Sequence, residues 1–169
     1  MKEWECITLS FPQSNKNIGL LVKSVVLPLG VGFLASLLTR QSMQMFSTLN
    51  KPPLSPPAIL FPIVWTILYT LMGISLYLVV TSGGEEEDVQ KAVRVYGIQL
   101  AVNFLWPTFF FNLQWYLFSF LWLLFLWILV IIMLIRFSKV SKAAAYINIP
   151  YLLWLTFAAY LNLGIFLLN

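Results

Sequence analysis

The sequence predicts an all-α membrane protein, a bundle of five transmembrane helices. Hydrophobic residues make up 60% of the chain and charged residues only 9%, whereas soluble domains contain roughly 25% charged residues. Several runs also lack charge altogether, and a run of about 20 such residues can cross the hydrocarbon layer as a helix. The composition excludes an ordinary soluble domain, and 169 residues suffice for one compact bundle.

Residues 1–17 are predicted to form a short N-terminal tail, because no apolar run there is long enough for the core of a signal peptide. The membrane domain then covers residues 18–169, and its first span is expected at about residues 18–39. Lys23 lies near the start of this span, where a lysine side chain can extend to the membrane interface.

A proline-rich loop is expected at residues 40–57. Its two proline pairs, Pro52-Pro53 and Pro56-Pro57, fix φ and remove backbone hydrogen-bond donors. The segment is therefore predicted to be a stiff lid and neither a helix nor a central strand.

The second span is expected at about residues 58–81 and contains no charge. It places Trp65 and Tyr69 four residues apart, so both rings share one helical face beneath the lid. An acidic segment at residues 82–88 follows, and we expect it to be a flexible, solvated turn.

The third and fourth spans are inferred from one long uncharged run. No residue is charged from Val95 to Ile135, which is too long for one span and right for two. Asn112-Leu113-Gln114 is the polar cluster near its middle and is predicted to be a tight turn. The spans are therefore expected at about residues 91–111 and 115–137, with a fifth span at 143–167.

Five spans place the two ends of the chain on opposite sides of the membrane. The loops on the N-terminal side carry eight basic residues, namely Lys2, Lys16, Lys23, Lys91, Arg94, Arg136, Lys139 and Lys142. The other side has only Arg40 and Lys51. Under the positive-inside rule the N-terminus is predicted to be cytoplasmic, with the lid and the C-terminus outside.

The ionisable residues exclude several classes of function. All six carboxylates lie outside the expected spans, whereas a proton relay or a cation-coupled carrier normally needs an ionisable group at membrane depth. The chain has no histidine and a single cysteine, Cys6, which argues against Ser-His-Asp chemistry, an internal disulfide and a cysteine-based metal cluster. We expect no metal, no organic cofactor and no nucleic-acid partner.

The third span carries a polar and aromatic stripe. At 100° per residue, four side chains fall in one narrow sector of the helix: Gln99, Asn103, Trp106 and Phe110. Asn103 fits either an interhelical hydrogen bond, worth about 0.6–2 kcal/mol, or a direct ligand contact.

The opposite face of the third span carries two small residues, Gly97 and Ala101. Small residues allow close helix contact in membranes. They could form the seam of a homodimer or serve as packing sites inside the bundle.

The fifth span repeats the combination of a large ring and a small residue, because Trp154 lies one turn from Ala158. Core packing is the default explanation of a single aromatic residue. Yet five aromatic rings from three spans each lie on the same helical face as a small or amide side chain. If these faces converge, the rings would form a flat, apolar cavity. These rings are Trp65, Tyr69, Trp106, Phe110 and Trp154.

These residues resemble the translocator protein family, also called the tryptophan-rich sensory protein or peripheral benzodiazepine receptor family. The resemblance covers the chain from about Ile18 onward, and several motifs in family order are more specific than any one of them. The motifs are Lys51-Pro52-Pro53 with Pro56-Pro57, Val64-Trp65-Thr66-Ile67-Leu68-Tyr69 with Gly73, Gln99-Leu100-Ala101-Val102-Asn103 with Trp106-Pro107 and Phe110-Phe111, and Pro150-Tyr151 with Trp154, Phe157-Ala158 and Leu161-Asn162.

The resemblance implies a five-helix bundle, commonly dimeric, that binds porphyrins, sterols and synthetic benzodiazepine-type or isoquinoline ligands beneath the first loop. Trp65 and Trp154 match two tryptophans implicated in light- and oxygen-dependent porphyrin breakdown, and are the candidate catalytic residues. Phe46 falls where some members have tyrosine. The candidate ligand-binding residues are Phe46, Trp65, Tyr69, Asn103, Trp106, Phe110, Trp154 and Ala158.

The sequence also departs from the family pattern. Leu54 replaces the tryptophan that is usual there, and this changes one expected lid contact. Animal members carry a cholesterol-recognition pattern that needs an aromatic residue near Leu163 and a basic residue near Leu167, and both are missing. A tetrapyrrole-binding role in a bacterial cell membrane is therefore favoured over cholesterol transport.

The functional hypothesis is a membrane receptor or sensor for porphyrins and other flat apolar ligands. The alternatives are an enzyme that degrades protoporphyrin with low efficiency in light and oxygen, and a tetrapyrrole or sterol transporter.

Overall fold

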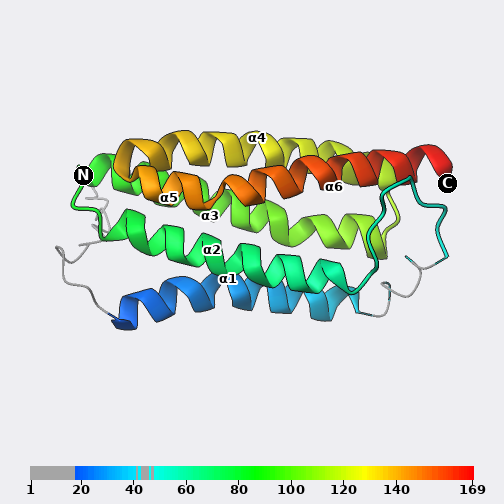
Figure 1. The fold of residues 1–169 in the computed structure, drawn as a ribbon, viewed down its shortest axis with the longest axis horizontal. Coiled ribbons are helices and arrows are strands. Elements are labelled where there is room, and N and C mark those ends of the chain that lie inside the picture. Colours follow the sequence, from blue (N-terminus) through cyan, green and yellow to red (C-terminus); the bar gives the residue numbers. More distant parts are fainter. Residues whose placement is uncertain (1–17, 41, 43–45, 47) are drawn as a thin grey trace, which may run out of the picture.

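The computed structural model describes residues 18–40, 42, 46 and 48–169, and the predicted tail at residues 1–17 lies outside them. Within this part of the chain, helices run up and down along one long axis, with α1 at one edge of the bundle and α4 at the opposite edge (Figure 1). The all-helical fold class is therefore confirmed. The helices are α1 (Ile18–Thr39), α2 (Leu60–Val80), α3 (Glu86–Pro107), the π-helix η2 (Thr108–Asn112), α4 (Tyr116–Val140), α5 (Lys142–Ile147) and α6 (Ile149–Leu168).

Four helical segments of the described chain are long and apolar enough to cross a membrane: α1, α2, α4 and the stretch Lys142–Leu168. The first half of α3 carries charged residues, which lowers its hydropathy. Its second half is uncharged from Val95 onward and continues into η2.

Close contact between α1 and α2 depends on glycine. A β-carbon at Gly73 would lie 2.5 Å from Val25 Cα, so only glycine lets the two backbones approach this closely. A β-carbon at Gly32 would overlap the Tyr69 ring. Pro28 does not interrupt α1, which is continuous from Ile18 to Thr39.

The acidic segment is only partly a turn, which corrects the expectation of a flexible loop over residues 82–88. Glu86, Glu87 and Asp88 form the first turn of α3, where carboxylates are favoured by the helix dipole. Lys91 pairs with Glu87 at 2.6 Å. The hydrogen bond and charge of Lys91 lower the pKa of the Glu87 carboxyl.

The chain turns between α3 and α4 over residues 113–115, at the predicted polar cluster. Gln114 adopts the left-handed conformation with φ 56°. Just before the turn, the Leu113 N–H donates to Thr108 O at 3.0 Å, the five-residue spacing of a π-helix.

The last segment is interrupted, whereas the sequence predicted one continuous span at residues 143–167. α5 ends at Ile147, and α6 begins at Ile149 with Pro150 in its first turn. Proline has no N–H to continue the helix and its ring clashes with the preceding turn. Asn148 stabilises the junction by donating its side-chain amide to Ala144 O at 2.9 Å.

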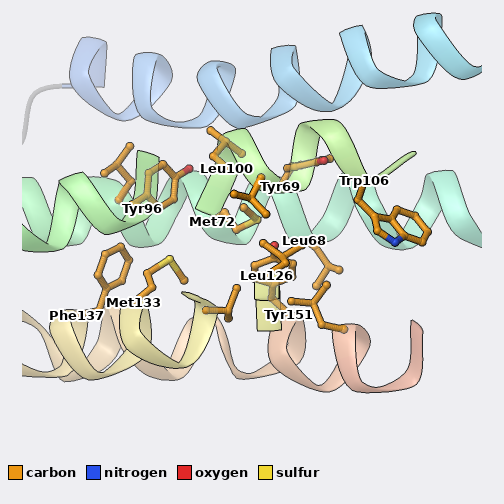
Figure 2. Close-up of a cluster of buried hydrophobic side chains, with 14 of the residues drawn as sticks. Leu68, Tyr69, Met72, Tyr96, Leu100, Trp106, Leu126, Met133, Phe137 and Tyr151 are labelled. Atoms are coloured by element: carbon orange, nitrogen blue, oxygen red, sulfur yellow. The ribbon is translucent and has the colours of Figure 1, made fainter. Parts of the chain in front are cut away.

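The core is a cluster of side chains chiefly from α2, α3, α4 and α6, joined by Phe46 of the loop, Phe110 of η2, and Ala144 and Ala145 of α5. Figure 2 shows Tyr96, Met133 and Phe137 at one end of this cluster and Trp106 at the other. The Tyr96 and Phe137 rings are stacked with centroids 6.2 Å apart. This packing fixes α3 against α4 and thereby positions the polar stripe of α3 within the bundle.

Candidate functional site

A cavity of about 400 Å³ lies between α1, α2 and the end of α3. Its walls come from the second half of α1 and the first half of α2, so it is at the same end of the bundle as the proline-rich loop (Figure 1). Leu29, Gly32, Phe33, Ala35, Ser36, Thr39, Phe61, Pro62, Trp65, Thr66, Tyr69, Asn103, Trp106, Pro107 and Phe111 line the cavity. Of the predicted site residues, Trp65, Tyr69, Asn103 and Trp106 are therefore brought together here.

Trp65 and Tyr69 lie side by side on α2, as their spacing requires, with ring centroids 5.3 Å apart. The Trp65 ring also meets Tyr151 of α6 edge-on, at 6.2 Å. Trp65 is partly buried and Tyr69 is buried. The cavity wall on α2 is thus a pair of electron-rich rings supported from behind by a third.

Asn103 connects the cavity to the polar interior of the bundle. Its side-chain nitrogen donates to the Tyr151 hydroxyl at 2.8 Å, and its oxygen accepts from the Tyr69 hydroxyl at 3.5 Å. The Tyr151 hydroxyl donates in turn to Gln99 Oε1 at 3.1 Å. Asn103 therefore makes interhelical hydrogen bonds and also lines the cavity, so its two proposed roles are compatible in geometry.

Two polar atoms near this network, Gln99 Nε2 and the Tyr96 hydroxyl, have no hydrogen-bond partner among the described residues although they are buried. Both groups belong to the inward face of α3. The polar groups buried behind the floor of the cavity are thus neutral. They are phenols and amides, and none of them is a carboxylate.

Trp106 lines the cavity and Phe110 does not. Phe110 is buried behind Trp106, with their rings stacked at 5.3 Å. The reason is the π-helix η2, whose wider turn changes the register after Pro107. Phe111 consequently lines the cavity, a position that a 3.6-residue period did not predict.

Phe46 lies in the loop and packs edge-on against Phe61, with ring centroids 5.5 Å apart. It also lies 6.1 Å from Phe111. Since Phe61 and Phe111 line the cavity, Phe46 covers the outside of its loop-side wall. The sequence offered no clear signal for Phe61, which is one of many aromatic residues in the chain.

Trp154 borders a second cavity, of about 400 Å³, between α2 and α6. The Trp154 ring packs edge-on against Phe61 at 6.0 Å, so Phe61 stands between Trp154 and the first cavity. The indole N–H of Trp154 is buried without a hydrogen-bond partner among the described residues. Ala158 is buried and lines neither cavity. The residues lining the second cavity are Val64, Ile67, Leu68, Pro150, Leu153, Trp154 and Phe157.

The two tryptophans at the middle of α4 have identifiable structural partners. The Trp122 indole donates to Val102 O at 2.8 Å, and the Trp127 indole donates to the Thr156 hydroxyl at 3.0 Å. These bonds tie α4 to α3 and to α6. Trp122 and Trp127 thereby differ from Trp65, which faces a cavity.

The proline-rich loop is attached to the end of α6. Asn50 and Asn169 exchange hydrogen bonds of 3.0 and 2.9 Å, and the Tyr160 hydroxyl donates to Pro53 O at 2.8 Å. Pro52 is buried against Gly164, where a β-carbon would come within 2.6 Å of the proline ring. The loop thus spans the end of the bundle from α1 to α6 (Figure 1).

The chemistry available at the site is binding by apolar rings with a few neutral polar groups. Within residues 18–40, 42, 46 and 48–169 there is no cluster of three or more His, Cys, Asp or Glu side chains that could hold a metal ion. Leu54, where the resemblance led us to expect tryptophan, lies in the loop with φ 67° and is 82% exposed.

Comparison with known proteins places the chain in a family. The profile of the TspO/MBR family matches residues 24–168. The chain is 39% identical to the tryptophan-rich protein TspO of Chlorobaculum tepidum over 92% of this chain and 99% of that protein. It is 40% identical to the TspO of Archaeoglobus fulgidus over 90% and 99%, and 34% identical to the translocator protein of Ovis aries over 78% and 79%. The chain is therefore an integral membrane protein that belongs to the TspO/MBR family.

Proposed function

We propose that the protein is a membrane receptor or sensor that binds porphyrins and other flat apolar molecules in the cavity between α1, α2 and α3. The observation that carries this proposal is the wall of that cavity, which combines Trp65, Tyr69 and Trp106 with one amide, Asn103. Ligand sites are typically apolar and aromatic, about 300–1,000 Å³ in volume, with few polar groups. Aromatic rings also favour stacking on a planar, delocalised ligand.

A second candidate function, light- and oxygen-dependent degradation of protoporphyrin with low efficiency, is supported by the position of Trp65. Its indole borders the cavity and contacts both Tyr69 and Tyr151, so an electron-rich ring would lie against a bound porphyrin. Trp154 would act from behind Phe61, 6.0 Å from that ring.

One titration separates these functions. Protoporphyrin is added to the purified protein in detergent, and Trp fluorescence and the porphyrin absorption spectrum are followed in the dark and under light. Saturable quenching with an unchanged spectrum supports the receptor, and a new product spectrum under light supports the enzyme. Movement of porphyrin across proteoliposomes would instead indicate a transporter. Quenching that never saturates overturns the proposed cavity site.

We also propose a homodimer that uses the outer face of α3. Gly97 and Ala101 are both exposed, and a β-carbon at Gly97 would meet no atom within 4 Å. Neither residue therefore packs inside this chain, whereas small residues on a lipid-facing surface allow close approach of a second helix. Cross-linking of Gly97→Cys protein in membranes tests the seam, with Gly30→Cys as the comparison site.

The orientation of the protein in the membrane is a further proposal. The described cations at the loop end are Arg40 and Lys51, and those at the opposite end are more numerous. The positive-inside rule then places the loop outside and the start of α1 in the cytoplasm.

A further inference from the structure

The first cavity is covered at its loop end. Phe46 packs there on Phe61 and Phe111, which line the cavity. The proline-rich loop that spans this end of the bundle is held to α6, because the Tyr160 hydroxyl donates to Pro53 O at 2.8 Å. A ligand that arrived from water at this end would therefore have to displace both the loop and the Phe46 ring.

Contacts of α1 close two further sides of the cavity. On the side of α3, Asn112 Nδ2 donates to Leu38 O at 3.0 Å and so joins η2 to the end of α1. Toward the middle of the bundle α1 and α2 are in close contact, because a β-carbon at Gly32 would overlap the Tyr69 ring and one at Gly73 would meet the backbone of α1. The cavity is thus bounded by protein on these sides.

The remaining side lies between α1 and α2, at the edge of the bundle that α1 forms (Figure 1). Four described residues line the cavity there and are also exposed on the surface: Phe33 and Ser36 of α1, and Pro62 and Thr66 of α2. Phe33 is 62% exposed although it borders the cavity. Within the described part of the chain, the cavity therefore reaches the flank of the bundle between these four residues, which we call the lateral mouth.

The lateral mouth lies where lipid surrounds the protein. Both α1 and α2 are long and apolar enough to cross a membrane. Phe33 and Thr66 each lie six residues from the loop end of their helix, which is about 9 Å at 1.5 Å per residue. The Ser36 hydroxyl donates to Phe33 O at 2.7 Å, and the Thr66 hydroxyl donates to Pro62 O at 2.8 Å. Since these donors are satisfied within their own helices and no described lining residue is charged, the mouth is compatible with hydrocarbon.

We propose that the first cavity takes up its ligand from the bilayer through the lateral mouth, and not from water past the proline-rich loop. The inference rests on the proposed function and deepens it, because it restricts the ligands to flat molecules that dissolve among lipid chains. Such a ligand exchanges one apolar surrounding for another, so shape and ring stacking decide its affinity. Loosening the loop would add a second route at the end of the bundle without closing the mouth.

The test attaches a bulky group at the mouth and measures how fast porphyrin passes. Ser36→Cys and Thr66→Cys are made separately in a Cys6→Ser background, and each protein in lipid vesicles is compared before and after reaction with N-benzylmaleimide. Stopped-flow Trp quenching gives the association rate of protoporphyrin, and trapping by excess empty vesicles gives its dissociation rate. Labelling should slow both rates by about tenfold and leave their ratio, Kd, nearly unchanged, because a blocked route slows entry and exit alike.

The matched controls are Leu34→Cys and Ile63→Cys, because both residues are exposed on the same two helices and line neither cavity. Labelling these variants should change neither rate. Unchanged rates in the two mouth variants, or equal slowing in the controls, would overturn the lateral route. Slower association without slower dissociation would also overturn it, since the label would then occupy the binding site itself.

A tethered probe tests the route in the wild-type protein, without any label. Protoporphyrin that carries one hexadecyl ester keeps its alkyl chain in the bilayer, so its ring can fill the cavity only through an opening that leaves this chain among the lipids. The wild-type protein should therefore show saturable quenching by the ester. If protoporphyrin saturates and the ester does not, the lateral route is wrong while the cavity site stands. If protoporphyrin itself does not saturate, the proposed function fails and the route with it.

Discussion

The side-chain nitrogen of Asn103 donates a 2.8 Å hydrogen bond to the Tyr151 hydroxyl, which joins α3 to α6 at the floor of the cavity. Tyr151→Phe removes the hydroxyl and leaves Asn103 Nδ2 and Gln99 Oε1 without that partner. A buried polar group without a partner costs about 1–3 kcal/mol, so the variant should unfold at a clearly lower temperature. Tyr146→Phe is the matched control, because Tyr146 is 66% exposed. Equal melting temperatures for the two variants in detergent would contradict the structural role of this bond.

Gly73→Ala should disturb the wall between α1 and α2. The added methyl group would lie 2.5 Å from Val25 Cα, and a backbone atom can move away only if the helices separate. Overpacking of this kind costs about 1–3 kcal/mol, and the separation should also weaken porphyrin binding. Gly30→Ala is the control, because it makes the same substitution at a position where the added β-carbon would meet no atom within 4 Å. It should leave stability and porphyrin affinity nearly unchanged.

Phenylalanine at Trp65 or Trp154 keeps most of the apolar area and removes the indole. If the indoles react with or orient the porphyrin, photodegradation should fall sharply while folding and binding largely persist. Trp122→Phe instead loses a hydrogen bond to Val102 O, worth about 1 kcal/mol, and should retain photodegradation. Rates of porphyrin loss under illumination are the measurement. Loss of activity in Trp122→Phe, together with full activity in both other variants, would reverse the assignment.

Tyr160→Phe should loosen the lid without altering the cavity walls. The Tyr160 hydroxyl donates to Pro53 O at 2.8 Å, and Tyr160 does not line the cavity. Loss of this bond should speed hydrogen exchange over residues 48–57 and increase the ligand dissociation rate by about threefold, the equivalent of a hydrogen bond of moderate net strength. Unchanged exchange and dissociation rates would show that the other loop contacts suffice to hold it.

The orientation is tested with a reporter that is active only in the cytoplasm, fused after Asn169. The bias of basic residues predicts that this fusion is silent, while the same reporter fused before Met1 is active. Activity after Asn169 would contradict both the count of five spans and the outward-facing loop.

Uncharged runs and proline positions were sufficient to predict the helical membrane fold, the proline-rich loop and the turn near Asn112. These features depend on the cost of placing charge or unpaired backbone groups in lipid, which acts on each segment separately. The family could likewise be recognised from the spacing of motifs around Trp65 and Asn103. Helix periodicity also correctly indicated that Trp65 and Tyr69 share a face.

Only the tertiary structure determined which rings meet in one cavity. Phe110 points away from the cavity and Phe111 lines it, because the π-helix η2 changes the helical register. A prediction based on the regular period of an α-helix cannot include that change. Trp154 is separated from the first cavity because Phe61 comes between them, a contact between α2 and α6. The hydrogen bond from Tyr160 to Pro53 joins residues 107 positions apart. Sequence by itself determines which segments enter the membrane, since that depends on local polarity, whereas packing between helices decides what the side chains face.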